Sequence, residues 1–382
     1  MNILITGARG FIGKNLSAAL ASIRDGLDKT RRIPEGITLY ELDTDTDPAC
    51  LEEYTKQCDF VYHLAGVNRP VEEAEFMTGN FGFTAQLLEC LKRHNNPAPV
   101  LMTSSIQAAL DNPYGRSKQA GEELILEYGR SQNVKTFVYR LPNVFGKWCR
   151  PNYNSVIATF CYNIARGLDI TVQDPGRKMT LVYIDDVVDE LIRCLSGAET
   201  RDGQYYCRVP VEHRITLGEI ADMIGAFAQN RKNLYIPDMP DGSFAQKLYS
   251  TFLSYLPETE FRCYPIMHQD QRGSFTELFK TERHGQVSVN ISKPGVTKGN
   301  HWHHTKNEKF AVVAGRGVIR FRRLGSQEIL EYYVSGDKIE IIDIPVGYTH
   351  SIENLGETDM VTVMWCNTCF DPDRPDTYFL EV

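Results

Sequence analysis

The sequence lacks any run of about 18 apolar residues, the shortest that makes a membrane-spanning helix, and it has no internal repeat or low-complexity tract. It also lacks an excess of positive charge, because 41 Lys and Arg against 49 Asp and Glu give a net charge of -8. These absences argue against membrane insertion and against a nucleic-acid partner. Because Met1 opens an apolar strand directly, we expect no signal peptide and a cytoplasmic location.

Cysteine is present but does not form a disulfide framework. The ten cysteines are scattered, and the one close pair, Cys366 and Cys369, has no second pair to complete a metal or redox motif. We therefore expect reduced thiols with structural roles, as in cytosolic proteins.

The length of 382 residues, at about 150 residues per domain, predicts two or three domains that each bury a core. A turn-rich stretch begins at Pro240, and the segment from Lys247 to Leu256 has the pattern of an aromatic-rich helical connector. We predict one domain over residues 1–250 and a second over residues 251–382.

A short apolar strand, Met1 to Thr6, leads directly into a glycine-rich turn and then into a helical stretch from Lys14 to Ile23. Glycines in such a turn let a pyrophosphate approach the backbone N–H groups at a helix N-terminus. The position between a strand and a helix is what turns a spaced glycine trio into a dinucleotide-binding signal. The cofactor-binding residues predicted in this segment are Gly7, Arg9, Gly10, Phe11, Ile12 and Gly13.

Tyr114 and Lys118 lie four residues apart in a predicted helix, so both side chains share one face. A phenol has a pKa of about 10, and a nearby ammonium group favours its ionised form. Tyr114 therefore has the chemistry of an acid/base group at neutral pH. A predicted strand that ends in three hydroxyl side chains, the last on Ser105, comes shortly before it.

Three further segments complete a pattern along the chain: His63-Leu64-Ala65-Gly66, Arg140 to Gly146, and Tyr183-Ile184-Asp185-Asp186. With the glycine turn and the Tyr–Lys pair, they resemble the extended short-chain dehydrogenase/reductases that act on nucleotide sugars. This resemblance implies a Rossmann-type, doubly wound parallel α/β sheet in the N-terminal domain.

The same resemblance implies roles for single residues. Tyr114 would be the proton donor, Lys118 would hold the nicotinamide ribose, and Ser105 would bond the reacting carbonyl oxygen, with Ser104 as the fallback. The resemblance also implies cofactor contacts from Leu64, Ala65 and Gly66, and substrate contacts from Asn143 and Arg150.

Two residues near the predicted cofactor site favour different cofactors. Asp43 follows an apolar strand, and an acidic residue there usually holds the adenosine ribose of NAD. The family resemblance implies NADPH instead, and Arg9 in the glycine turn can pair with its 2′-phosphate. We expect NADPH, with NADH as the alternative.

The second half of the chain carries a metal-type motif, Gly-x5-His-x-His-x4-Glu-x6-Gly, followed by Pro-x-Gly-x2-His-x3-Asn. Side chains two apart on a strand face the same way, so the first two imidazoles can converge with the glutamate and the distant third imidazole. Three or four such ligands are the composition of a catalytic site for Zn or a similar divalent metal. The predicted ligands are His301, His303, Glu308 and His350, and the spacing leaves open whether one imidazole, His303 first among them, faces substrate instead.

This segment resembles the cupins, which are small all-β barrels. Asp270 to Glu277 and Gly295 to His301 are also similar to the nucleotide-sugar 3,5-epimerases of the rhamnose pathway, which use the aligned histidine as the base and no metal. Lys298 stands where those enzymes carry arginine, and we expect it to contact substrate. The sequence leaves the epimerisation base open among His303, His304, Lys298 and Lys309.

Together the two halves resemble, over essentially the whole chain, the bifunctional capsular-polysaccharide enzymes in which such a reductase is fused to a cupin. The resemblance implies C3 epimerisation and then NADPH-dependent reduction of the C4 ketone in a UDP-linked 2-acetamido-2,6-dideoxy-hexos-4-ulose, on the route to UDP-N-acetyl-L-fucosamine. Both domain types commonly pair, so we expect a homodimer.

Two alternatives remain open. One is an NAD-dependent nucleotide-sugar 4-epimerase or dehydratase with an accessory cupin, although dehydratases usually carry an acidic pair where Ile106-Gln107 follow Ser105. The other is a sugar-nucleotide sensor without catalysis, which would have no use for a proton donor.

Overall fold

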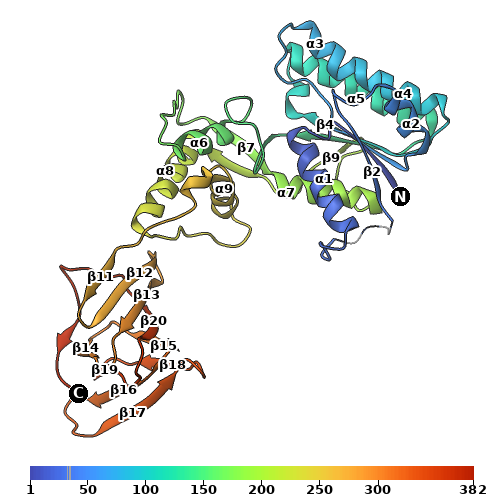
Figure 1. The fold of residues 1–382 in the computed structure, drawn as a ribbon. Coiled ribbons are helices and arrows are strands. Elements are labelled where there is room, and N and C mark those ends of the chain that lie inside the picture. The colour runs from blue at the N-terminus through green and yellow to red at the C-terminus, as the bar shows by residue number, and fades with distance from the viewer. Residues whose placement is uncertain (32, 34–35) are drawn as a thin grey trace. The chain divides into compact units, whose positions relative to one another are not determined.

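The computed structural model describes residues 1–31, 33 and 36–382. These residues divide into two compact units, the first made of Met1–Ile224 and Gly242–Pro257, the second of Gly225–Asp241 and Glu258–Val382. The division falls within helix α8 (Leu217–Asn233), while the predicted boundary between residues 250 and 251 lies within helix α9 (Phe244–Leu253). Figure 1 shows the elements of both units.

A seven-stranded sheet in the order β2-β1-β3-β4-β5-β9-β8 organises the first unit. All of its strand pairs are parallel except β8 with β9. The order steps from β1 to β2 on one side and from β1 to β3 on the other, so a topological switch point lies at the carboxyl end of β1. The strands are β1 (Asn2–Thr6), β2 (Thr38–Leu42), β3 (Phe60–His63), β4 (Val100–Ser105), β5 (Thr136–Leu141), β8 (Arg201–Asp202) and β9 (Tyr206–Cys207).

Helices cover both faces of this sheet (Figure 1), because successive side chains of each strand point to opposite sides. Ile3 and Ile5 belong to one core cluster, and Leu4 between them belongs to the other. The first cluster packs on α1 (Phe11–Arg24) and α7 (Ile184–Arg193). The second packs on α2 (Ala49–Gln57), α4 (Phe83–Arg93) and α5 (Pro113–Gln132). Short helical turns join these elements at α3 (Ala74–Phe76), η1 (Met77–Gly82), η2 (Ile106–Ala109) and η3 (Cys194–Ser196).

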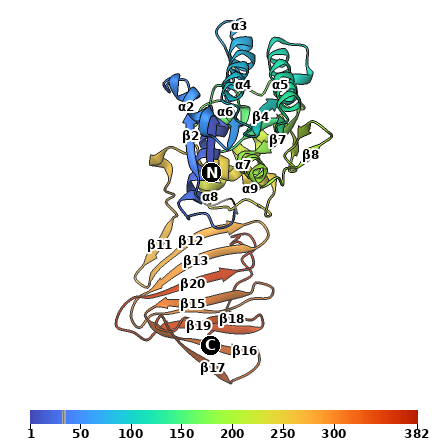
Figure 2. The same ribbon diagram turned by 90° about the vertical axis from the view of Figure 1, so that its right-hand side faces the viewer.

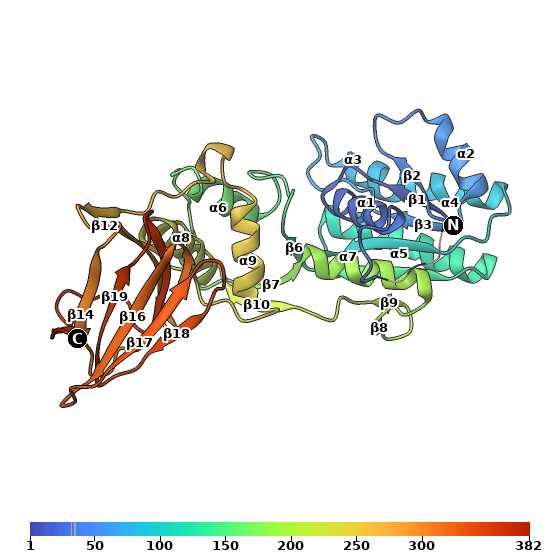
Figure 3. The ribbon, with the colours of Figure 1, turned by 60° about the horizontal axis from the view of Figure 1, so that its bottom comes forward.

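A smaller sheet in the order β10-β7-β6 completes the first unit. It consists of β6 (Asn143–Phe145), β7 (Lys178–Tyr183) and β10 (His213–Thr216). Helix α6 (Val156–Ile164) and α9, which stands beside this sheet in Figure 3, bury apolar faces here, and Leu248 of α9 is fully buried. The predicted helical connector therefore corresponds to α9.

Two antiparallel sheets form most of the second unit. The six-stranded sheet contains β11 (Met267–Asp270), β12 (Gly273–Thr281), β13 (Gly285–Ser292), β20 (Met360–Cys366), β15 (Glu308–Ala314) and β18 (Ile341–Ile344), side by side in that order in Figure 2. The five-stranded sheet contains β17 (Ile329–Ser335), β16 (Arg316–Arg323), β19 (Tyr348–Asn354), β14 (Thr297–Trp302) and β21 (Tyr378–Phe379). A 3-10 turn, η4 (Glu258–Glu260), precedes them.

The core of the second unit takes residues from both sheets. Phe310 and Met360 come from the six-stranded sheet, and Ile319, Phe321 and Ile352 come from the five-stranded sheet. The predicted Rossmann-type parallel sheet followed by an all-β domain is therefore confirmed. Within the described residues no ladder joins the two C-terminal sheets, so closure into a cupin barrel stays a prediction.

The structure also bears on membrane insertion and on the state of the cysteines. None of the helices in the described ranges combines the length and the hydrophobicity that a bilayer span requires. All ten cysteines are free thiols.

Candidate functional site

The glycine turn lies at the switch point of the large sheet, where β1 ends. Gly7 has φ +71°, and a Cβ atom there would stand 2.7 Å from the backbone N of Ala65, just beyond β3. At Gly13, in the first turn of α1, a Cβ would stand 2.1 Å from the Gly7 carbonyl oxygen. Glycine is therefore required twice, once for the turn and once for the close packing of helix on turn. Gly10 precedes α1 directly, so Phe11 and Ile12 lie at the helix N-terminus, a position whose free backbone N–H groups suit a pyrophosphate.

The ends of β2 and the glycine turn meet through Arg9. Its backbone N–H donates to Asp43 Oδ2 (2.7 Å), and its guanidinium forms an ion pair with Asp45. A cavity of about 600 Å³ lies beside this pair and is lined by Ala8, Arg9, Lys14, Ser17, Ala18, Glu41 and Trp148. The structure thus brings Arg9 and Asp43 together, and it adds Lys14, a cation that sequence reasoning did not select.

Ser105 and Tyr114 meet at the carboxyl edge of the sheet. Ser105 is the last residue of β4, and Tyr114 lies in the first turn of α5, which Asn112 caps by accepting from the Gly115 N–H (2.8 Å). Burial raises the pKa of Tyr114, and the hydrogen bond with Ser105 opposes that rise. The predicted lowering of this pKa by Lys118 is therefore wrong, because desolvation outweighs the other effects.

Lys118 lies one turn further along α5 and is only 6% exposed. Burial lowers its pKa to about 8, while the charge of Glu122 acts in the opposite direction. Its ammonium approaches the loop after β3 so closely that a Cβ on Gly66 would stand 2.8 Å from Lys118 Nζ. The structure therefore brings Leu64, Ala65 and Gly66 to the same place as the predicted Tyr–Lys pair.

The Ser104 side chain contacts other residues than the Ser105 side chain does. Its hydroxyl donates to Glu122, a side chain that is 1% exposed and that Arg140 also contacts through two of its nitrogens. The Ser105 oxygen instead accepts from the Gln107 N–H and faces Tyr114. The geometry supports Ser105, and not the fallback Ser104, as the serine that meets substrate.

Asn80 is a residue of this site that sequence reasoning missed. It is buried within the π-helical turn η1 and donates to the Val67 carbonyl (3.1 Å) and to Ser117 Oγ (3.0 Å), while its Oδ1 accepts from the Val67 N–H (2.9 Å). These bonds hold the loop after β3 against α5. Such turns often mark functional sites, but a π-helical turn has no sequence signature that could have revealed it.

The two predicted substrate residues of this unit lie on β6 and on the loop that follows it. Asn143 begins β6 and is exposed. Arg150 is exposed, and its Cζ lies 5.0 Å from the centre of the Tyr153 ring. Among the described residues, no hydrogen bond connects Asn143 with Arg150.

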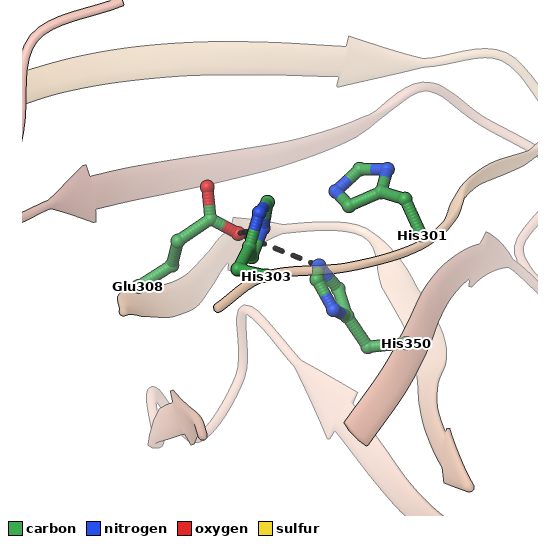
Figure 4. A group of neighbouring side chains, drawn as sticks. All are labelled: His301, His303, Glu308 and His350. Atoms are coloured by element: carbon green, nitrogen blue, oxygen red, sulfur yellow. Dashed lines mark ion pairs between the residues drawn. The ribbon is translucent and has the colours of Figure 1, made fainter. Parts of the chain in front are cut away.

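The four predicted metal ligands converge in the second unit (Figure 4), where one ligand atom from each lies within 4.8 Å of every other. His301 and His350 are register partners on β14 and β19, and Glu308 begins β15 in the other sheet. His303 lies just beyond the end of β14, so the predicted reason for convergence, strand alternation, is incomplete. The strand is irregular between Gly299 and His301, where Asn300 has φ +58°.

The arrangement of these four residues fits a divalent ion. Glu308 Oε2 lies 3.4 Å from His303 Nε2 and 3.4 Å from His350 Nε2, which is the spacing of tetrahedral ligands that each stand ~2.1 Å from a central ion. All three atoms are buried and have no hydrogen-bond partner. The other nitrogen of His303, Nδ1, lies 2.6 Å from the Asp376 carbonyl oxygen, the kind of bond that orients an imidazole for metal binding.

The charges in this cluster suit metal ligands. Burial, with His350 and His303 adding to it, lowers the pKa of His301 to about 4, so its imidazole is neutral at pH 7. Burial alone would raise the pKa of Glu308, but the two imidazoles and Lys306 outweigh burial and hold that pKa well below its usual range. Lys306, which sequence reasoning missed, lies 3.4 Å from Glu308 Oε1, the oxygen that the imidazoles do not contact.

A cavity of about 310 Å³ opens beside the cluster and shares His350 with it. Lys298 lines this cavity and donates from Nζ to Asn290 Oδ1 (2.7 Å) and to the Ile291 carbonyl (2.8 Å). Burial lowers the pKa of Lys298. His268, Asp270 and Arg272 also line the cavity and were not predicted as site residues.

The other base candidates lie elsewhere. Lys309 follows Glu308 on β15, so it points to the opposite face, where it forms an exposed ion pair with Asp343. His304 is exposed and packs edge-on against Trp302 and Tyr378. Of the four candidates, only Lys298 lines the cavity and only His303 belongs to the metal-type cluster.

Comparisons with known proteins also divide the chain into an N-terminal and a C-terminal part. Residues 3–206 match the NAD dependent epimerase/dehydratase family, and residues 268–378 match the polysaccharide biosynthesis C-terminal domain. A Pseudomonas aeruginosa protein named UDP-2-acetamido-2,6-beta-L-arabino-hexul-4-ose reductase is 41% identical over 100% of this chain and 99% of its own length.

Solved structures extend the comparison. The capsular polysaccharide assembling protein CapF from Staphylococcus aureus superposes with a TM-score of 0.92 and 53% identity, and the match covers 100% of both chains. RMD from Pseudomonas aeruginosa, solved with NADPH, covers 67% of this chain and 99% of its own at a TM-score of 0.51 and 23% identity, which shows the fold alone.

Proposed function

The chain belongs to the NAD dependent epimerase/dehydratase family and, along its whole length, to the CapF-like capsular polysaccharide proteins, and from this premise we propose that it catalyses two successive steps on one UDP-sugar. The C-terminal unit inverts C3 of a UDP-2-acetamido-2,6-dideoxy-hexos-4-ulose. The N-terminal unit then reduces the C4 ketone, giving UDP-2-acetamido-2,6-dideoxy-L-talose on the route to UDP-N-acetyl-L-fucosamine for capsule or O-antigen. The use of a nucleotide sugar and NADPH makes the cytoplasm the proposed location.

The observation that carries the reductase step is the meeting of Ser105 and Tyr114 beside the buried Lys118 at the cofactor edge of the sheet. NADPH supplies the hydride when it is bound. Ser105 orients the carbonyl oxygen, and Tyr114, whose raised pKa keeps it protonated, donates its proton to that oxygen. Lys118 would hold the nicotinamide ribose, and its ammonium lies so close to Gly66 that a Cβ there would stand 2.8 Å from Nζ.

NADPH is the proposed cofactor, with NADH as the alternative. Arg9 supports NADPH because its guanidinium can move from Asp45 to a 2′-phosphate, with Lys14 beside the same cavity. Asp43 supports NADH less well than predicted, because its carboxylate already accepts from the Arg9 N–H.

For the epimerase step we propose that His301, His303, Glu308 and His350 hold a divalent ion, with Zn the first choice. A divalent ion in this position would supply Lewis-acid stabilisation of negative charge next to the cavity. The 4-ketone acidifies the proton on C3, and Lys298 is the cavity's candidate for contacting the sugar there. Asn290 and the Ile291 carbonyl fix the position of its ammonium.

We also propose that the protein is a homodimer. The edge strand β17 exposes four apolar side chains, Ile329, Leu330, Tyr332 and Tyr333, and an edge strand with exposed apolar side chains is a surface for pairing with another chain.

One assay tests the function as a whole. The purified protein is given the UDP-4-keto sugar with NADPH or with NADH, and cofactor oxidation is followed by absorbance. In parallel, the sugar is incubated in deuterated water without cofactor, and mass spectrometry follows exchange at C3. We expect exchange without cofactor and oxidation of NADPH faster than of NADH. Absence of both reactions would overturn the proposed function.

A further inference from the structure

The last residues of the chain lie along the strand that carries the first of the four predicted metal ligands. Strand β21 pairs with β14, and Phe379 stands opposite His301 in that pairing. The Leu380 N–H donates to the Asn300 carbonyl (3.0 Å), so the contact continues beyond the two paired residues. We call residues 376–382 the C-terminal segment. It packs directly against the part of the barrel-like domain that holds the ligand cluster.

The first residue of this segment, Asp376, bonds to four consecutive residues of the loop between β14 and β15. Its carboxylate accepts from the backbone N–H groups of His304 (3.0 Å), Thr305 (2.8 Å) and Lys306 (2.9 Å). The Thr305 hydroxyl donates to the same carboxylate (2.9 Å), and the Asp376 carbonyl oxygen lies 2.6 Å from His303 Nδ1. Successive N–H groups that converge on one carboxylate form strong, charge-assisted hydrogen bonds. One residue from the end of the chain therefore holds the loop that contains His303.

The backbone is unusual on both sides of this contact. Asp376 has φ +40° and Asn300 has φ +58°, a left-handed conformation that residues other than glycine rarely adopt. The Leu380 N–H and the Val382 N–H both bond to Asn300, the first to its carbonyl and the second to Oδ1 (3.4 Å). Such conformations persist where the surrounding structure imposes them, and they gather at functional sites. Here the contact between the C-terminal segment and the ligand-bearing strand imposes them.

Two of the four predicted ligands depend on the loop residues that Asp376 holds. The bond at His303 Nδ1 leaves Nε2 of the same ring directed at Glu308 Oε2, 3.4 Å away. Lys306, whose N–H the Asp376 carboxylate accepts, places Nζ 3.4 Å from Glu308 Oε1. A ligand that is already held in its bound conformation loses less freedom when the ion binds, and this raises affinity.

We propose that Asp376 is a positioning residue of the ion site: it fixes residues 303–306 in the conformation that presents His303 to a divalent ion, without contacting the ion itself. The inference rests on the proposed function in one respect, that His301, His303, Glu308 and His350 hold an ion. Groups that orient metal ligands in this way contribute about 10- to 100-fold to metal affinity. A residue that only stabilised the domain would leave the ion affinity of the folded protein unchanged.

The test compares the full-length wild-type protein with Asp376→Asn, and the probe is Zn²⁺ alone. Asparagine keeps the shape of the side chain and tolerates the left-handed backbone, but it lacks the charge and turns an amide N–H2 group toward the N–H donors of the loop. Competition with a chromophoric chelator measures the Zn²⁺ affinity, which we expect to fall about 10- to 100-fold. Asp373→Asn, which changes an exposed aspartate three residues earlier, is the matched control and should bind Zn²⁺ as the wild-type protein does.

Two further measurements separate positioning from stability. Denaturant unfolding of the metal-free proteins reports stability alone, and the Zn²⁺ affinities are compared under conditions in which every variant is folded. Co²⁺ replaces Zn²⁺ as a spectroscopic probe, because its visible absorption depends on coordination geometry. We expect this absorption to change in Asp376→Asn, where His303 is displaced, and to stay the same in Asp373→Asn.

Equal Zn²⁺ affinity in Asp376→Asn and the wild-type protein would overturn the inference and leave the proposed function intact. An equal loss in Asp373→Asn would also overturn it, because the effect would then come from negative charge near the site and not from the bonds to the loop. If the wild-type protein bound no divalent ion, the proposed ion site would fail and the inference with it. Weakened Zn²⁺ affinity in a protein that neither exchanges the C3 proton nor oxidises NADPH would leave the inference standing while the proposed function fails.

Discussion

The two sites differ in how far the protein satisfies its own polar groups. In the reductase site several polar groups have a protein partner: Ser105 bonds with Tyr114, Arg9 pairs with Asp45, and Asn80 holds the loop next to Lys118. In the C-terminal cluster the imidazole and carboxylate atoms that face one another are buried and have no hydrogen-bond partner. The unsatisfied buried atoms of the second site suit an ion, whereas these polar groups of the first site are bonded within the protein, so we expect removal of one group to affect the two sites differently.

The largest expected effect is on the reductase step alone. Tyr114→Phe removes the proposed proton donor, and we expect NADPH oxidation to fall by about 100- to 10,000-fold, the usual contribution of general acid catalysis. Exchange of the C3 proton with deuterium should continue at the wild-type rate, because we propose that it takes place in the other unit. Turnover that survives this substitution would remove Tyr114 from the mechanism.

Separate substitutions of the neighbouring Ser104 and Ser105 test which serine serves the reductase step. Ser105→Ala should lower kcat for NADPH oxidation, whereas Ser104→Ala should mainly lower the free energy of unfolding, because it takes one hydrogen bond from the buried Glu122. The reverse pattern would restore Ser104 as the serine that meets substrate.

The next effect is on the C-terminal cluster. His350→Ala should weaken metal binding by at least about 100-fold, since even groups that only orient ligands contribute 10- to 100-fold. Metal content is measured by elemental analysis, and C3 exchange by mass spectrometry. We expect both to fall while NADPH binding is unchanged. Lost metal with full exchange would make the ion structural and leave Lys298 to be tested as the base.

A smaller effect concerns cofactor choice. Arg9→Gln should raise KM for NADPH about tenfold and leave KM for NADH nearly unchanged, because only NADPH carries the 2′-phosphate. Steady-state kinetics with both cofactors measure this difference. Equal changes for the two cofactors would show that Arg9 acts on a part that they share.

The smallest effect is a pH dependence of stability. The pKa of Lys118 is about 8 in the folded protein and about 10.4 in an unfolded chain, so the unfolded chain binds more protons between these values and stability rises with pH there. Lys118→Met should remove a gain of roughly 1 kcal/mol in the free energy of unfolding between pH 7 and 9. Denaturant titrations of both proteins at the two pH values measure it. An identical pH dependence would mean that Lys118 is not desolvated.

Local patterns predicted much of the first unit. The strand from Met1 to Thr6, the glycine turn and the helix after it occur almost as predicted, because strand period, glycine geometry and helix pattern are all local. The same holds for the strand that ends at Ser105. The four C-terminal side chains that converge, His301, His303, Glu308 and His350, were also selected from the sequence, because their spacing forms a recognisable motif.

Contacts between distant segments could not be predicted. The direction of the Tyr114 pKa was predicted wrongly because burial comes from segments that the Tyr–Lys spacing does not contain. Lys309 was considered as a base, but the alternation of β15 turns it away from Glu308 toward Asp343. Asn80 and Lys306 were missed because each acts through residues that only the fold brings near.

The sequence by itself therefore determined the two kinds of domain, the glycine turn, the Tyr–Lys pair and the four side chains of the metal-type cluster, since each depends on spacing within a few residues or on one recurring motif. Only the tertiary structure decided which serine faces Tyr114, how far Lys118 is desolvated, and which lysine lines the C-terminal cavity. Those properties depend on burial and on distances between segments far apart in the chain, and folding alone sets both.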